Sequence, residues 1–287
     1  MSASSEVILP KNFDIRKISY GLPKQQATGG KTIFISYDSQ QLYLQTPAMK
    51  APFGVSMWPS DNGGPDKYSL DLSFEGRESR EGVQAFFDTL QSLDKRLVID
   101  AMENSQAWFK KKYASVEVVE ALFSPTVRYP KDRQTGEVDP RYAPTVKMTL
   151  PFKDGKFLFP SFGSRREEID MLEAYASART KGARFQVIFQ ISAIWIVGSK
   201  FGAMLKVRQL KMEETVRLSG YAFQATEEDA PEDDEDVAAA AKAPVVRRIA
   251  APPAPAANKL MMAESEDEEE EAGKAAPQFV DDEGIEP

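Results

Sequence analysis

The stretch RFQVIFQISAIWIV, residues 184–197, carries the strongest β-strand pattern of the chain. Apolar side chains occupy every second position from Phe185 to Val197. Polar residues stand between several of them, at Arg184, Gln186, Gln190 and Ser192. Because the side chains of a strand point alternately to opposite faces, one face of this strand is predicted to cover a core. Trp195 belongs to the apolar face and is expected to pack in that core.

The segment GSKFG, residues 198–202, supplies turn residues directly after this strand. Residues 204–211 resume a strand pattern and are expected to return as the antiparallel partner of 184–197. The carboxyl-terminal part of the ordered body is therefore predicted to be a long hairpin.

Shorter β-type runs precede the hairpin and are separated by residues typical of turns. They lie at 32–37, 41–45, 53–58, 68–74, 126–129, 145–152 and 156–160. In the run 68–74, apolar residues recur at period two, which is typical of a half-buried strand. Lys153-Asp154-Gly155 favours a hairpin turn between the last two runs.

The apolar period changes between residues 81 and 109. Val83, Phe86, Leu90, Leu93 and Leu97 recur at steps of three and four, which predicts one long amphipathic helix. A shorter helix is expected at 115–123, and 165–178 is a candidate surface helix.

This layout predicts a mainly β fold with one long helix, in the form of an OB-fold-like Greek-key barrel. A β-sandwich is the alternative. We expect an irregular lead-in at 1–30 and an OB-like domain at 31–225. Residues 226–287 are rich in Glu, Asp, Ala and Pro, a composition that predicts a disordered acidic tail.

The two parts of the chain have opposite charge. Residues 1–225 hold 31 basic and 25 acidic residues, while 226–287 hold 5 basic and 19 acidic residues. The body is thus +6 and the tail −14, which together give the net charge of −8. This asymmetry favours a body that binds a polyanion. A tethered polyanionic tail would compete for the same basic groove and, once displaced, bind basic partners.

The composition also argues against several classes of function. The chain has no Cys and no His, which removes disulfides, thiolate metal sites and the histidine-based catalytic arrangements. The composition still permits carboxylate or lysine catalysis, but we expect no enzymatic activity, cofactor or metal site. The start MSASSEVILPKNFD does not look like a secretory signal, and the longest apolar run, 188–197, is too short to span a membrane. An intracellular protein with no membrane partner is expected.

Two partial motifs do not support a ligand site. Gly29-Gly30-Lys31-Thr32 resembles the end of a phosphate-binding loop, but Gln25 replaces the required glycine and a strand follows instead of a helix. The stretch 61–66 lacks the alternating acidic residues of a calcium loop. Both segments are predicted to be turns.

Single strands of nucleic acid bind to grooves that combine cations with aromatic faces. Such residues alternate at several places in the body. The predicted contacts are Lys110, Lys111, Lys112, Tyr113, Arg128, Tyr129, Lys131, Tyr142, Lys147, Lys200, Phe201, Lys206 and Arg208. Lys147, Lys206 and Arg208 are favoured because their strand neighbours occupy the buried face.

Four stretches carry a resemblance to a known family: LVIDAMENS at 97–105, SPTVRYPKD at 124–132, YAPTVK at 142–147 and IWIVGSKFG at 194–202. In these residues the chain resembles the single-stranded DNA-binding proteins of nucleocytoplasmic large DNA viruses, especially those infecting algae. That family is related to phage-type binders with an OB-fold core and an acidic tail.

The resemblance implies sequence-independent binding of single-stranded DNA in viral replication, recombination and repair. It also implies a location in the host nucleus or viral replication site, and tail contacts to a polymerase or helicase. Tails of this type often end in an aromatic residue, whereas this one ends in GIEP. Phe279, with Asp281 and Asp282, is the candidate replacement for partner binding.

Two other functions fit the same features. One is an RNA-binding protein or RNA chaperone on the same fold. The other is a virion structural or histone-chaperone-like protein that acts through its acidic tail. The sequence also leaves open whether the chain forms a homo-oligomer.

Overall fold

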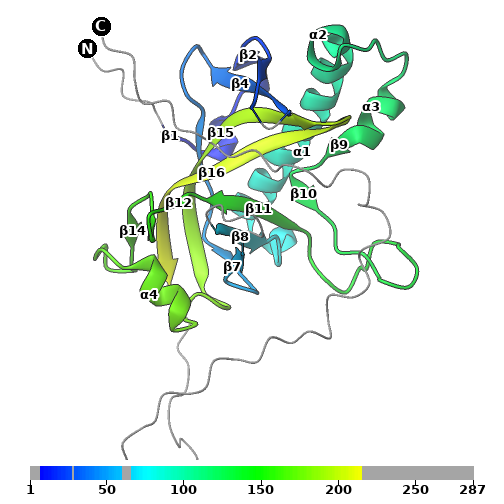
Figure 1. Cartoon of the computed structure of the whole chain (residues 1–287). Helices are drawn as coiled ribbons and strands as arrows, with labels where there is room; N and C mark the ends of the chain where they lie inside the picture. Colours follow the sequence, from blue (N-terminus) through cyan, green and yellow to red (C-terminus); the bar gives the residue numbers. More distant parts are fainter. Residues whose placement is uncertain (1–6, 28, 60–65, 215–287) are drawn as a thin grey trace, which may run out of the picture. The chain divides into compact units, whose positions relative to one another are not determined.

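A computed structural model describes residues 7–27, 29–59 and 66–214 of the chain. This part is mainly β-structure with one long helix (Figure 1). The strands are β1 Val7–Ile8, β2 Ile18–Tyr20, β3 Lys24–Gln25, β4 Lys31–Tyr37, β5 Tyr43–Gln45, β6 Met49–Lys50, β7 Val55–Trp58, β8 Lys67–Ser73, β9 Phe123–Ser124, β10 Val127–Arg128, β11 Thr145–Leu150, β12 Phe152–Lys153, β13 Lys156–Phe157, β14 Ser161–Phe162, β15 Arg184–Val197 and β16 Lys200–Glu213. The helices are α1 Glu81–Glu103, α2 Ser105–Phe109, α3 Val116–Leu122 and α4 Met171–Ala176, with 3₁₀ turns η1 Pro10–Asn12, η2 Ile15–Lys17 and η3 Arg77–Ser79.

Five strands close into a barrel. In space, β6 pairs with β8, β8 with β11, β11 with β16, β16 with β15, and β15 again with β6. This is the Greek-key barrel of OB-fold type that the sequence predicted. Figure 1 shows β15 and β16 as a long hairpin, with α2 and α3 near its turn and α4 near its other end. Closure leaves each strand with one face toward the core and one toward solvent.

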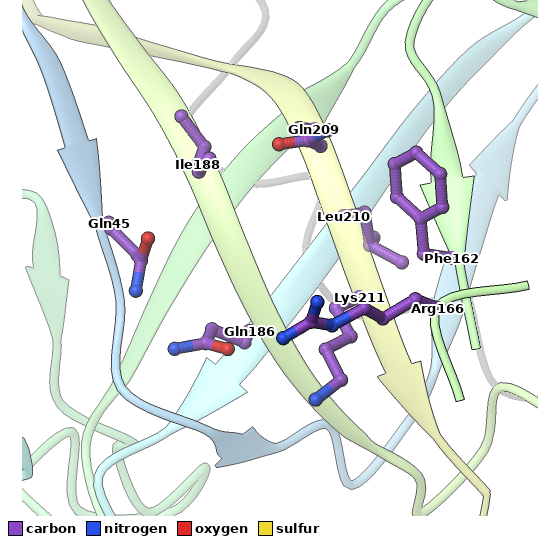
Figure 2. Close-up of a pocket in the computed structure, with 8 residues that line it drawn as sticks. All are labelled: Gln45, Phe162, Arg166, Gln186, Ile188, Gln209, Leu210 and Lys211. Carbon is purple, nitrogen blue, oxygen red and sulfur yellow. The ribbon is translucent and has the colours of Figure 1, made fainter. Parts of the chain in front are cut away.

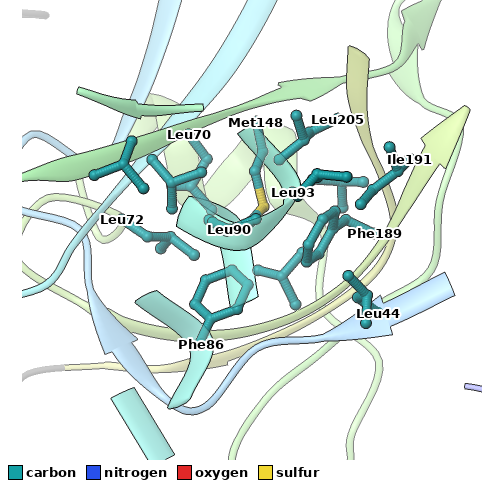
Figure 3. Packing of buried hydrophobic residues seen from close by; sticks show 14 of the residues in the cluster. Leu44, Leu70, Leu72, Phe86, Leu90, Leu93, Met148, Phe189, Ile191 and Leu205 are labelled. Carbon is teal, nitrogen blue, oxygen red and sulfur yellow. The ribbon is translucent and has the colours of Figure 1, made fainter. Parts of the chain in front are cut away.

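Helix α1 supplies a large share of the core. Its buried side chains recur at steps of three and four and include Phe86, Leu90 and Leu93. These meet inward residues of the barrel strands, among them Met148 and Phe189, as Figure 3 shows. Phe86 and Phe189 are in edge contact, with ring centroids 5.9 Å apart. The barrel interior is therefore filled by the helix, which leaves the outward faces of the strands for ligands.

A bulge in the long hairpin changes which face of β15 is buried. The register of β15 against β16 shifts between Ile191 and Ala193. Before the shift Phe189 and Ile191 point inward, and after it Ile194 and Ile196 do so. An extra residue in a strand reverses the direction of every later side chain. The prediction that Trp195 packs in the core is therefore wrong: Trp195 lies on the outward face and is only half-buried.

Other boundaries differ from the sequence-based ones. Residues 7–25, expected to be irregular, contribute β1, β2 and β3, and β2 pairs with β4 along its whole length. The single helix expected over 81–109 is interrupted at Asn104, whose side-chain amide donates to the carbonyl oxygen of Asp100 at 2.8 Å. Such local bonds compete with helix continuation. The helix expected over 165–178 covers only Met171–Ala176.

Within the described residues, no helix is both long and apolar enough to cross a membrane. The acidic stretch 226–287, with Phe279, Asp281 and Asp282, lies outside the described residues.

Candidate nucleic-acid interface

The outward face of β7, β8, β10 and β11 combines an exposed indole with cations. Trp58 ends β7 and is 49% exposed. The ammonium of Lys147, from β11, lies 5.1 Å from the centroid of the Trp58 ring. Arg128 on β10 pairs with Thr145, two residues before Lys147, and therefore shares this face. We call Trp58, Lys147 and Arg128 the Trp58 surface.

One acidic side chain lies within the Trp58 surface. Asp71 on β8 stands directly opposite Lys147 on β11. Burial raises the pKa of the Asp71 carboxyl, while the charges of Lys147 and Arg128 act in the opposite direction. The Asp71 carboxylate therefore partly offsets the positive charge of the Trp58 surface. Within the described residues, this carboxylate accepts no hydrogen bond.

Two further predicted cations extend this face onto β16. Lys206 is in register with Thr149, which follows Lys147 by two residues on the same face. Arg208 lies at the second bulge of the hairpin, and its guanidinium donates to Oε1 of Gln190 at 2.9 and 2.6 Å. The structure thus brings together four of the predicted contacts: Arg128, Lys147, Lys206 and Arg208. They form a line along β10, β11 and β16.

The residues after Arg128 form an exposed loop next to this line. Tyr129 accepts a hydrogen bond at its hydroxyl from Nε2 of Gln91 at 3.1 Å, and Tyr142 is 63% exposed. Lys131 forms an isolated bridge with Val138, which closes the loop on itself. Arg141 is held by Asp139 and stacks 5.8 Å from the Tyr142 ring centroid. Tyr129, Lys131 and Tyr142 are therefore at the surface, as a contact role requires.

The lysines at the end of α2 form a separate group. Lys110, Lys111 and Lys112 are all exposed, and Lys110 takes a left-handed conformation (φ 58°) that ends the helix. Tyr113 is half-buried against Phe109, at a centroid distance of 5.6 Å. Phe109 contacts Phe201, so this group lies beside the start of β16 rather than on the Trp58 surface.

Phe201 was predicted as a contact, and the structure contradicts this. Its side chain is 0% exposed and packs between Phe109 and Phe123, at centroid distances of 5.3 and 5.1 Å. Phe201 opposes Ile196 on the inward face of the hairpin. Its neighbour Lys200 is exposed at the turn and remains available.

Sequence reasoning missed Trp58, Phe34 and Trp195 as aromatic residues on the outward face, of which Trp58 and Phe34 are exposed and Trp195 is half-buried. Trp58 was assigned to a strand without a role, although it directly precedes a stretch rich in turn residues. Phe34 and Trp195 lie on the outward face of β4 and β15, where Phe34 is 43% exposed and Lys24 lies 5.2 Å from its ring centroid. Trp195 was assigned to the core because the apolar pattern does not reveal the bulge between Ile191 and Ala193.

No group of His, Cys, Asp or Glu suited to a metal ion occurs in the described part of the chain.

The described body is similar to two phage single-stranded DNA-binding proteins. The first, from bacteriophage Enc34 and solved in complex with single-stranded DNA, aligns with a TM-score of 0.40 and 9% identity over 69% of this chain and 98% of that chain. The second, gp2.5 encoded by bacteriophage T7, aligns with a TM-score of 0.38 and 12% identity over 68% of this chain and 97% of that chain. No family model and no curated protein matches the sequence.

Proposed function

We propose that this chain binds single-stranded DNA without sequence preference through the Trp58 surface. The observation that carries the proposal is the half-exposed Trp58 indole with the Lys147 ammonium 5.1 Å from its ring centroid. Such a pair offers one flat face for a base and one cation for the adjoining phosphate. Because every base has a π-face, stacking of this kind tolerates any sequence.

The remaining cations give the strand a path. Arg128, Lys206 and Arg208 continue the line of positive charge along β10, β11 and β16. Phosphates bound along this line would release counterions, which makes affinity fall steeply with salt. Tyr129 and Tyr142 offer further stacking faces at one end. The proposal assigns binding alone and no catalytic residue.

The cellular role is a finer proposal. The sequence resemblance to binders from large DNA viruses supports a role in replication, recombination and repair at the host nucleus or viral replication site. The charge of −14 on residues 226–287 supports competition with DNA for the cations of the body and recruitment of a polymerase or helicase. Phe279, Asp281 and Asp282 are the proposed partner contacts.

Titration of the full chain against oligo-dT, a double-stranded DNA of equal length and the matching RNA tests the binding proposal. We expect oligo-dT to bind tighter than duplex, because stacking on Trp58 needs an unpaired base. A preference for RNA would replace DNA binding with the RNA-binding alternative. Absence of binding to all three, together with binding to basic proteins, would favour the histone-chaperone-like alternative.

A further inference from the structure

A cavity separate from the Trp58 surface lies on the outward face of the barrel, at the end of the hairpin away from its turn. It is a cavity of about 300 Å³ over β5, β15, β16 and β14 (Figure 2). Two cross-strand rows form its floor. The first row holds Gln45, Ile188 and Gln209, and the second holds Gln186, Lys211 and Phe162. An aromatic ring, three amides and a cation therefore face one cavity.

Arg166 covers this floor from a tight turn after β14. The turn is closed by the amide of Gly163, which donates to the carbonyl of Glu167 at 2.8 Å, and by the amide of Arg166, which donates to the carbonyl of Gly163 at 3.1 Å. Arg166 has a left-handed backbone (φ 68°), a conformation that is unfavourable for a residue with a side chain. Strained backbone of this kind is concentrated at functional sites.

Arg166 and Lys211 are the two cations of the cavity, and acidic side chains neutralise their charge only in part. Figure 2 shows the head groups of Arg166 and Lys211 reaching toward the same end, where the amide of Gln186 lies. Lys211 has an exposed ion pair with Glu213 at 3.8 Å, which is a weak interaction. In the part of the chain that the structure describes, no ion pair or side-chain hydrogen bond engages the Arg166 guanidinium. A bound anion would relieve the repulsion between the two cations.

We infer that this cavity is a nucleotide subsite that holds one nucleotide of a bound single strand, an inference that rests on the proposed function. Arg166 and Lys211 bind its phosphate, and the ring of Phe162 supports its base. The side chains of Gln45, Gln186 and Gln209 each carry donors and an acceptor, so they satisfy the edge of any base. A carboxylate alone would leave the Phe162 ring without a contact, so the cavity suits a nucleotide better.

The subsite lies within reach of a strand bound at the Trp58 surface. Lys206 aligns with Thr149, and Lys211 follows five residues later on the same strand. At about 3.3 Å per residue in parallel strands, the two residue steps on β11 and five on β16 place Lys147 and Lys211 about 23 Å apart along the sheet. That is about seven nucleotides of a strand stacked at about 3.4 Å per nucleotide, as in a duplex, and fewer of an extended strand. Both counts fall within the site sizes of about 4–16 nucleotides known for OB-folds.

The test compares Arg166→Ala and Phe162→Leu in the full chain, with Arg165→Ala as the matched control. Arg165 is an exposed arginine next to Arg166 that does not line the cavity. Leucine at 162 keeps apolar packing and removes the aromatic face. Affinity for dT12 and dT4 is measured at several salt concentrations, beside Trp58→Ala.

We expect Arg166→Ala to weaken dT12 binding about two- to fivefold relative to Arg165→Ala. It should also lower the slope of log affinity against log salt by about 0.7, as loss of one phosphate contact requires. Phe162→Leu should weaken dT12 binding by about fivefold or more. dT4 is too short to span both sites and would occupy the subsite in only part of its complexes, so it should show a smaller salt-slope change than dT12.

Three other outcomes would each overturn part of the account. If Trp58→Ala weakens binding while Arg166→Ala and Phe162→Leu match the control, the subsite is wrong and the proposed function stands. If Arg166→Ala alone has an effect, the cavity binds an anion only and the nucleotide assignment is wrong. If the wild-type chain binds neither oligonucleotide, the proposed function fails and the subsite with it.

Discussion

Lys147 and Trp58 are 89 positions apart in the sequence and lie on different strands. In the fold, the Lys147 ammonium is 5.1 Å from the centroid of the Trp58 ring. Both side chains point outward from the barrel, so neither belongs to the hydrophobic core. The contact orients the indole beside a cation, which is the geometry that a stacked base and its phosphate require.

Replacing Trp58 by Ala should weaken oligo-dT binding about 5- to 150-fold, the effect of losing one stacked base. Fluorescence anisotropy with labelled dT12 measures this change, and circular dichroism checks the fold. Met57→Ala is the neighbouring control, because that side chain lies on the other face of β7. Equal affinities for the Trp58 and Met57 variants would show that the indole is not a contact.

Replacing Asp71 by Asn should tighten binding about two- to fivefold at low salt, because the variant removes a negative charge opposite Lys147. The pKa of the Asp71 carboxyl is raised by burial. Wild-type affinity should therefore rise as the pH falls and the carboxylate gains a proton. The Asn variant should lack this part of the pH dependence. Weaker binding by the variant would mean that Asp71 orients Lys147 rather than repelling phosphate.

Asp94 on α1 should make stability depend on pH. Burial raises the pKa of its carboxyl from 3.8 to about 7, while hydrogen bonds, among them the one from the amide of Thr126 to Oδ2 at 2.9 Å, act in the opposite direction. The folded state thus holds a proton that the unfolded state has released between about pH 4 and pH 7. Stability should fall as the pH rises through this window, by an upper bound on the order of 4 kcal/mol.

Thermal unfolding at pH 5.5 and pH 8 measures this effect, with Asp94→Asn as the test variant. We expect the wild-type melting temperature to be lower at pH 8 and the difference to shrink in the variant. A wild-type melting temperature that is equal or higher at pH 8, or a variant with the same pH difference, would contradict the assignment.

Replacing the carboxylates of residues 266–271 by amides in the full chain should tighten oligo-dT binding at low salt and have little effect at high salt. The tethered polyanion and the DNA compete for the same cations, and salt screens both. The same substitutions should weaken capture of basic partner proteins. An unchanged affinity at low salt would leave the tail without a role in binding DNA.

The sequence predicted the parts of the fold that depend on local periodicity. The steps of three and four from Val83 to Leu97 correctly predicted α1, and alternation correctly located the long hairpin. The bulge between Ile191 and Ala193 was not predictable, because an inserted residue leaves the apolar pattern intact while it reverses the exposed face. Gly202 shows the consequence: a Cβ there would lie 3.0 Å from the Trp195 ring, so the indole occupies the space that a side chain would fill.

The candidate site was predicted only in part for a related reason. Lys147, Lys206 and Arg208 were recognised because their strand neighbours are buried. Trp58 and the nucleotide subsite arise from pairings between distant strands, such as Lys211 with Gln186 and Phe162, which no local pattern reveals. Phe201 was wrongly predicted as a contact together with Lys200. Adjacent residues of a strand point to opposite faces, so the exposed Lys200 leaves Phe201 on the buried face.

The most direct test of the central claim is a titration of labelled dT12 with the wild-type chain and the Trp58→Ala/Lys147→Ala double variant at two salt concentrations. Lys153→Ala serves as control, since Lys153 is exposed on β12, which pairs with β13 in a separate two-stranded sheet and carries none of the residues of the Trp58 surface. We predict salt-sensitive binding by the wild type and the control, and a loss of at least about tenfold in the double variant. Equal binding by all three proteins, or no binding by the wild type, would contradict single-strand binding at this surface.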